Sequence, residues 1–112
     1  MKAIRLSRIA ELTGNSPVSG RLDIKITSVC YDSRKAVKNS VFFCLVGAIS
    51  DGHDYALDAY ERGCRVFVCE RMPRGFPIRG TKVLIAKQGT RAALADVAAE
   101  FYGHPEKILK LV

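Results

Sequence analysis

The chain has 112 residues, 48% of them hydrophobic and 26% charged, and its formal net charge is +7 at pH 7. This length supports one domain with a single modest core, and the composition is that of an ordinary globular protein. No apolar run approaches the roughly 20 residues that a membrane-spanning helix needs. Residues 1–12 carry charge throughout and lack the apolar core of a secretion signal. We therefore expect a single-domain cytoplasmic protein.

The positive charge is concentrated in residues 62–91, where eight basic side chains face only one acidic side chain, Glu70. Such a segment can serve a nucleic-acid backbone, an anionic small molecule or an acidic partner surface, or it can be a solvated face. It contains no known nucleic-acid-reading motif, which makes nucleic acid the weaker of these options.

The four cysteines are expected to be reduced and buried. Cys30, Cys44 and Cys69 lie in apolar runs typical of strands, and no two cysteines form a CxxC pair. Neither His53 nor His104 lies at zinc-ligand spacing from a cysteine pair. The acidic residues are also scattered along the chain. The sequence therefore predicts no metal site.

In the first half of the chain, apolar residues at helical spacing predict a short helix over residues 5–12. The alternation of apolar and polar residues over 23–31 predicts one strand. Residues 41–46 form a continuous apolar run, typical of a strand that is buried on both faces. Asn39 precedes this run in a polar turn, where it tolerates a left-handed backbone.

The second half alternates between the two periodicities. It predicts a helix over 55–62, strands over 65–69 and 83–86, a helix over 91–101 and a last strand over 108–112. A strand, a helix and a strand in succession favour a parallel pair with a right-handed connection. We predict an α/β fold with a mixed, largely parallel sheet of about five strands flanked by helices, in one domain.

Polar residues follow two of the predicted strands, as Asp32-Ser33-Arg34 and as Gly47 to Asp51. Because ligands of open α/β sheets bind beyond the carboxyl ends of the strands, we expect both segments to line one edge of the sheet. The helix start at 52–54 offers backbone N–H groups suited to a diphosphate. The sequence has no GxxxxGK[ST] loop, and no histidine lies beside Ser33 to act as a base. These features predict binding without catalysis.

The segments DSR, FFCLVG and DGHDYALDAYERGCRVFVCE together resemble the amino-terminal domain of the Mur ligase family, most closely its tripeptide-synthetase branch. The segment ALADVAAEFYGHPEKILKLV resembles the stretch that runs into a phosphate-binding loop in this family. The resemblance implies a fragment, cut before the ATP-binding domain of an ATP-dependent acid–amino-acid ligase of peptidoglycan synthesis. Such a fragment is expected to be inactive alone.

The same resemblance implies the ligand and its contacts. The domain would bind the UDP part of UDP-N-acetylmuramoyl-dipeptide, while the missing central and carboxy-terminal domains would bind ATP with magnesium and the incoming amino acid. The implied substrate-binding residues are Tyr31, Ser33, Ala48, Ile49 and Ser50. Secondary candidates are Asp32, Arg34, Asp51, Gly52 and His53. Relatives often carry His-Gln-Ala-like residues where Ala48-Ile49 stands, so contacts from this loop are expected through its backbone.

Several of these residues also fit purely structural roles. Asp32 suits the N–H groups of its own turn, Arg34 suits a surface ion pair, and His53 suits a local cap. By periodicity alone, Tyr31 belongs to the core. The alternative function is a free-standing basic interaction module that binds nucleic acid or an acidic protein through residues 62–91.

Overall fold

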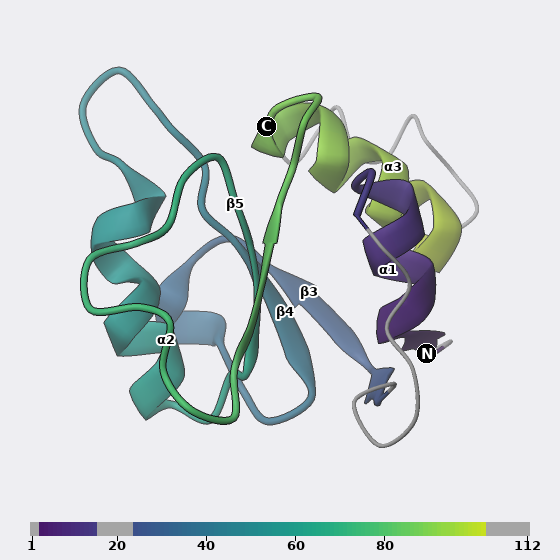
Figure 1. The fold of residues 1–112 in the computed structure, drawn as a ribbon, viewed down its shortest axis with the longest axis horizontal. Coiled ribbons are helices and arrows are strands. Elements are labelled where there is room, and N and C mark those ends of the chain that lie inside the picture. Colours follow the sequence, from purple (N-terminus) through teal and green to yellow (C-terminus); the bar gives the residue numbers. More distant parts are fainter. Residues whose placement is uncertain (1–2, 16–23, 103–112) are drawn as a thin grey trace.

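A parallel sheet lies between two layers of helices in the computed structural model, which describes residues 3–15 and 24–102 (Figure 1). Its four strands are hydrogen-bonded in the order in which they occur along the chain. They are β3 (Ser28–Cys30), β4 (Ser40–Phe43), β5 (Val66–Cys69) and β6 (Lys82–Ile85). The predicted α/β fold is thus confirmed, and the expected strand over 108–112 lies outside the described residues.

The two central strands are buried on both faces, as the continuous apolar run predicted. Every residue of β4 and β5 is buried, and neighbouring side chains point into opposite cores. Phe42 and Phe67 pack edge to face with their ring centroids 6.2 Å apart, and the ring centroid of Phe76 lies 4.9 Å from that of Phe67 in the same core. β4 ends at Phe43, earlier than predicted, because Leu45 turns to accept a hydrogen bond from the N–H of Gly52.

The predicted single strand over 23–31 is wrong, because two short strands belonging to different sheets occupy this segment. β2 (Lys25–Ile26) pairs antiparallel with β1 (Ile4–Arg5), whereas β3 pairs parallel with β4. Thr27 separates them and donates its N–H to the carbonyl of Asn39, with N and O 2.8 Å apart. Asn39 adopts the left-handed conformation that the sequence predicted, with φ 66°.

The helices lie where the apolar spacing predicted, with boundaries shifted by at most one residue. Helices α1 (Leu6–Leu12) and α3 (Thr90–Tyr102) cover one face of the sheet, and α2 (Ala56–Glu61) covers the other (Figure 1). Two 3₁₀ turns, η2 (Ser33–Lys35) and η3 (Gly52–Tyr55), follow β3 and β4. Within the described ranges, no helix has both the length and the apolar character to cross a membrane.

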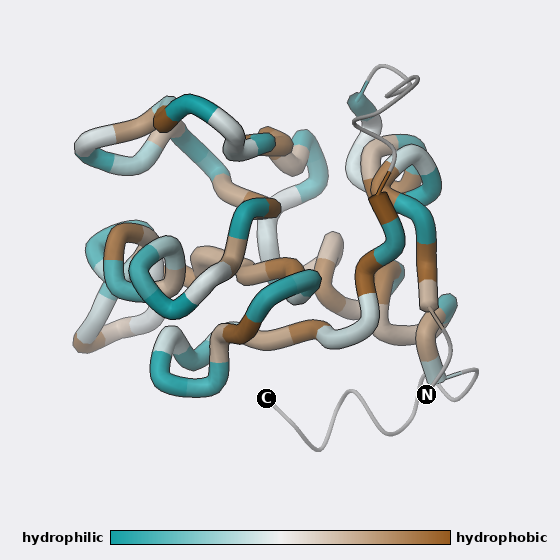
Figure 2. Tube along the Cα trace, turned by 90° about the horizontal axis from the view of Figure 1, so that it is seen from below, coloured by the Kyte–Doolittle hydropathy of each residue, from teal (hydrophilic) through white to brown (hydrophobic). Residues whose placement is uncertain are grey.

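Each face of the sheet has its own core. The α1 and α3 side is mainly aliphatic, and its largest fully buried residues are Phe43, Leu6, Ile9, Ile26 and Leu84. The α2 side holds Phe42, Phe67 and all four cysteines, which are free and buried as expected. Figure 2 shows hydrophobic stretches through the interior of the molecule and hydrophilic stretches mainly along its outer turns.

Candidate ligand-binding cleft

A cleft of about 770 Å³ opens beyond the carboxyl ends of β3 and β4, a volume typical of small-ligand sites. It is lined by Tyr31, Asp32, Ser33, Arg34, Leu45, Gly47, Ser50, Gly52, Tyr55, Asp58 and Arg91. The polar segments that follow the two strands therefore meet at one edge of the sheet, as the sequence predicted. Tyr55 and Asp58 add a wall from η3 and α2, and Arg91 adds one from α3.

The structure brings most of the predicted site residues to this cleft. Of the implied substrate contacts, Tyr31, Ser33 and Ser50 line it; of the secondary candidates, Asp32, Arg34 and Gly52 do. Ala48 and Ile49 do not line it and lie in the loop between Gly47 and Ser50, where Ile49 is fully exposed at 101%. Asp51 and His53 do not line it either.

The first wall of the cleft is stabilised by an ion pair within η2. The Asp32 carboxylate accepts from the backbone N–H of Arg34 at 3.0 Å and pairs with its guanidinium through contacts of 3.0 and 2.8 Å. This pairing, together with the backbone hydrogen bond, lowers the pKa of Asp32 to about 2. Asp32 and Arg34 thus already perform the structural roles that the sequence left open beside ligand binding.

Ser33 connects this wall to α2. Ser33 is buried at 6% exposure and faces the Asp58 carboxylate. The proximity of Ser33, followed by the contact of Arg62 Nε at 3.2 Å, lowers the pKa of Asp58. Asp58 was not predicted as a site residue, because its proximity to Ser33 depends on the packing of α2 against η2.

The second wall is a tight loop between Val46 and Asp51. These two residues form an antiparallel bridge, and the N–H of Gly47 donates to the carbonyl of Ser50 at 2.8 Å. Gly52 follows with its backbone packed against the chain after β4, where a Cβ atom would lie 2.6 Å from the nitrogen of Leu45. Only glycine fits at this position without moving backbone atoms.

The helix start after this loop is not available to an anion. The N–H of Gly52 donates to Leu45 O, that of His53 donates to the Asp51 carboxylate, and that of Asp54 donates to Asp51 O. The expectation that residues 52–54 offer free N–H groups to a diphosphate is therefore wrong. Asp51 itself supplies the negative charge that a helix start favours.

A hydrogen-bond network continues from Asp51 through His53 into β5. His53 is 3% exposed; its Nδ1 donates to Asp51 Oδ1 at 2.6 Å, and its Nε2 accepts from the N–H of Glu70 at 3.0 Å. Arg71 pairs with the second oxygen of Asp51, and this contact is the main reason why the pKa of that carboxyl is far below its usual value. His53 therefore has the local structural role that the sequence allowed.

The network ends at the start of α3. Glu70 Oε2 accepts from the backbone N–H of Thr90 at 3.1 Å and from its hydroxyl at 3.0 Å, which lowers the pKa of Glu70. The Glu70 side chain thus occupies the N-terminus of α3, as a capping carboxylate does. Asp51, His53, Glu70 and Thr90 together join the second wall of the cleft to the helix that carries Arg91, and we name them the Asp51–Thr90 network.

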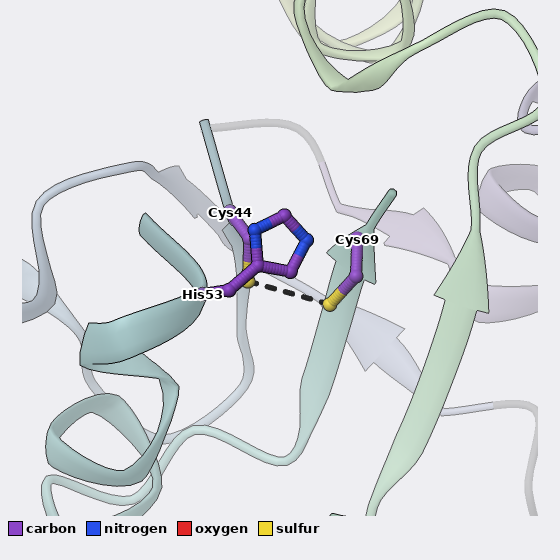
Figure 3. A group of neighbouring side chains, drawn as sticks. All are labelled: Cys44, His53 and Cys69. Carbon is purple, nitrogen blue, oxygen red and sulfur yellow. Dashed lines mark hydrogen bonds between the residues drawn. The ribbon is translucent and has the colours of Figure 1, made fainter. Parts of the chain in front are cut away.

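Cys44, His53 and Cys69 lie together in the interior, with their candidate ligand atoms within 4.8 Å of one another (Figure 3). Their spacing in the sequence did not reveal this group, because Cys69 ends β5 whereas Cys44 directly follows the neighbouring strand β4. The thiols contact each other at 3.3 Å, which together with burial raises the pKa of Cys44. Both nitrogens of His53 are engaged in the Asp51–Thr90 network, so no lone pair faces a metal ion. We interpret the cluster as a packing element.

The basic segment 62–91 is not a single patch, because several of its members have separate internal partners. Arg62 pairs with Asp58 and Arg71 pairs with Asp51. Arg65 lies 4.0 Å from the centre of the Tyr60 ring and donates to the carbonyl of Tyr60 at 2.7 Å. These contacts weaken the interpretation of the segment as a nucleic-acid surface.

Comparison with known proteins identifies the family. The family model described as Mur ligase family, catalytic domain, matches residues 25–102. The chain belongs to the Mur ligase family. It is 39% identical over 97 residues to the UDP-N-acetylmuramoyl-L-alanyl-D-glutamate–2,6-diaminopimelate ligase of Cytophaga hutchinsonii, and this match covers 85% of the chain. The corresponding ligase of Clostridioides difficile is 40% identical over 95 residues, again with 85% of the chain covered.

Solved structures of the family share the fold. The UDP-N-acetylmuramoylalanyl-D-glutamyl-2,6-diaminopimelate–D-alanyl-D-alanyl ligase of Acinetobacter baumannii superposes with a TM-score of 0.68 at 23% identity, covering 88% of this chain and 21% of that one. The match to each of the two diaminopimelate ligases covers 19% of the relative's length. This Mur ligase chain thus spans about a fifth of the relatives that it matches.

Replacing Gly52 by alanine is expected to reduce the free energy of unfolding by about 1–3 kcal/mol, the usual cost of overpacking. The added methyl group would meet backbone atoms of Cys44 and Leu45, which cannot rotate away. Chemical denaturation measures the loss. Gly47→Ala is the matched comparison, because its Cβ would lie 3.3 Å from a single carbonyl oxygen and should cost less. Equal stability of Gly52→Ala and the wild type would contradict the close approach.

Replacing Asp51 by asparagine is expected to destabilise the fold at neutral pH by about 1 kcal/mol, given the exposure of Arg71. Because folding lowers the pKa of Asp51, its contribution is present above the unfolded value near 3.8 and is lost as the pH falls through the folded value. The deficit of Asp51→Asn should therefore shrink between pH 7 and pH 3 in urea unfolding. Asp54→Asn, at an exposed neighbour, is the control. A deficit independent of pH would contradict the network.

Proposed function

We propose that this chain is the amino-terminal, substrate-binding domain of an ATP-dependent ligase of peptidoglycan precursor synthesis. Its cleft binds the UDP part of UDP-N-acetylmuramoyl-dipeptide. Family membership supports this proposal, since the names of the relatives describe ligases acting on UDP-N-acetylmuramoyl-L-alanyl-D-glutamate. The low coverage of those relatives supports the further proposal that separate domains complete the enzyme.

The observation that carries the proposal is the meeting of two polar segments at one cleft. One wall offers the half-exposed Tyr31, 40% exposed, on which a uracil ring can stack, and the hydroxyl of Ser33. The other offers Gly47, Ser50 and Gly52. An aromatic surface and a few polar groups in a concave site are what recognition of a nucleoside requires.

The chemistry of the ligase belongs to the other domains in this proposal. The sequence contains no GxxxxGK[ST] loop to hold the phosphates of ATP. ATP and magnesium would bind to the central domain, and the incoming amino acid would bind to the carboxy-terminal domain. The role of this chain is to hold the nucleotide end of the substrate, so that the peptide carboxylate reaches the reacting groups.

Titration calorimetry with the 112-residue chain tests the proposal. UDP-N-acetylmuramoyl-dipeptide and UDP should bind and compete with each other, and ADP should bind more weakly because its base is a purine. Failure of both uridine ligands to bind would overturn the proposal. A parallel titration with a DNA duplex at physiological salt tests the alternative, and tight binding there would favour the basic interaction module.

Replacing Ser33 by alanine should weaken UDP binding while the fold persists. Loss of one neutral hydrogen bond costs about 0.5–1.5 kcal/mol, or roughly a two- to twelve-fold loss of affinity. Ser28→Ala is the matched control, because its hydroxyl is buried on β3 without a partner among the described residues and lies outside the cleft. Unchanged affinity together with a lower melting temperature would show that Ser33 only joins η2 to α2.

A further inference from the structure

The charged side chains that line the cleft differ in whether they are already neutralised. Asp32 and Arg34 pair with each other, and Asp58 pairs with Arg62. Among the described residues, no hydrogen bond or ion pair is found for the fourth, Arg91. Of the four charged side chains that line the cleft, only Arg91 has no counterion among the described residues.

Arg91 is also held in place by the fold. It is the second residue of α3, directly after Thr90, which is fully buried and bonded to the Glu70 carboxylate. Ala93 and Leu94, in the same turn, are buried in the core. A side chain on such a fixed helix start loses little backbone freedom when it binds a ligand.

An anionic ligand in the cleft has no alternative donors at the expected helix start. The backbone N–H groups of residues 52–54 are all engaged within the chain, as is the N–H of Thr90. The charge of Arg34 is already balanced by Asp32, which takes its Nε and Nη2 donors and leaves mainly Nη1 for an anion. A planar guanidinium such as that of Arg91 binds two phosphate oxygens at once.

We propose that Arg91 binds the diphosphate of the nucleotide ligand and thereby makes the cleft selective for nucleoside diphosphates over the uncharged nucleoside. This inference rests on the proposed function of the cleft and adds a residue that neither the sequence motifs nor the comparisons assign. The sequence placed Arg91 in the basic segment 62–91, whose interpretation did not distinguish it from its neighbours. The start of a helix a few residues after the end of a strand was the available signal.

Titrations of the chain with UDP and with uridine test the role of Arg91. Arg91→Ala should lower the affinity for UDP by about ten-fold or more, as expected for loss of a hydrogen bond to a charged group, and leave the affinity for uridine unchanged. Alanine favours helices and the site is exposed, so the variant should fold, which thermal unfolding monitored by circular dichroism checks. Arg91→Lys should retain part of the UDP affinity, because it keeps the charge without the planar fork.

Arg79→Ala is the charge-matched control, because Arg79 is exposed in a loop outside the cleft. Its affinity for UDP should equal that of the wild type. The inference is overturned if Arg91→Ala binds UDP as tightly as the wild type does, or if Arg79→Ala loses as much affinity as Arg91→Ala. If the wild type binds neither UDP nor uridine, the proposed function itself fails, which is a distinct outcome.

Discussion

The Asp51–Thr90 network is the interaction on which the geometry of the cleft depends. It connects the loop after β4, the residue that follows β5 and the start of α3, and so adds side-chain hydrogen bonds beyond the last pairs of the sheet. Its central imidazole is almost completely buried and uses both ring nitrogens, one toward Asp51 and one toward the N–H of Glu70. A buried polar group without such partners would be costly, so this network selects one arrangement of the three segments.

The network also explains why the backbone N–H groups at two helix starts stabilise the fold and are not open to a ligand. The carboxylates of Asp51 and Glu70 occupy the N–H groups of two helical segments, which would otherwise attract an anion. The cleft is consequently left with side chains and loop backbone as its recognition groups. The parallel sheet places these groups at one edge, and the two cores on its faces keep that edge fixed.

Periodicity and composition predicted the features that are set by local sequence. The apolar run over 41–46 indicated a strand buried on both faces, and Asn39 indicated a left-handed turn. Ligands of open α/β sheets bind beyond the carboxyl ends of the strands, and this generalisation predicted that residues 32–34 and 47–51 share one edge before the strand pairing was known. The motifs that resemble the Mur ligase family led to the same segments from a different direction.

Features that depend on contacts distant in sequence could not be predicted. The strand over 23–31 divides between two sheets because β1 pairs with its first part, a choice that periodicity does not encode. The proximity of Asp58 to Ser33, and of Cys44 to His53 and Cys69, arises from packing between elements. Arg91 lines the cleft because α3 begins at the edge of the sheet where the two segments after β3 and β4 also lie.

We propose that one cleft, at the ends of β3 and β4, holds the nucleotide of the substrate. Amide chemical-shift mapping of the labelled chain, during titration with UDP-N-acetylmuramoyl-dipeptide, tests the position of this site directly. The largest shifts should fall in residues 31–34, 46–52 and 90–92, which border the cleft. Large shifts confined to other segments, such as the loop over 71–80, or no shifts at saturating ligand, would contradict it.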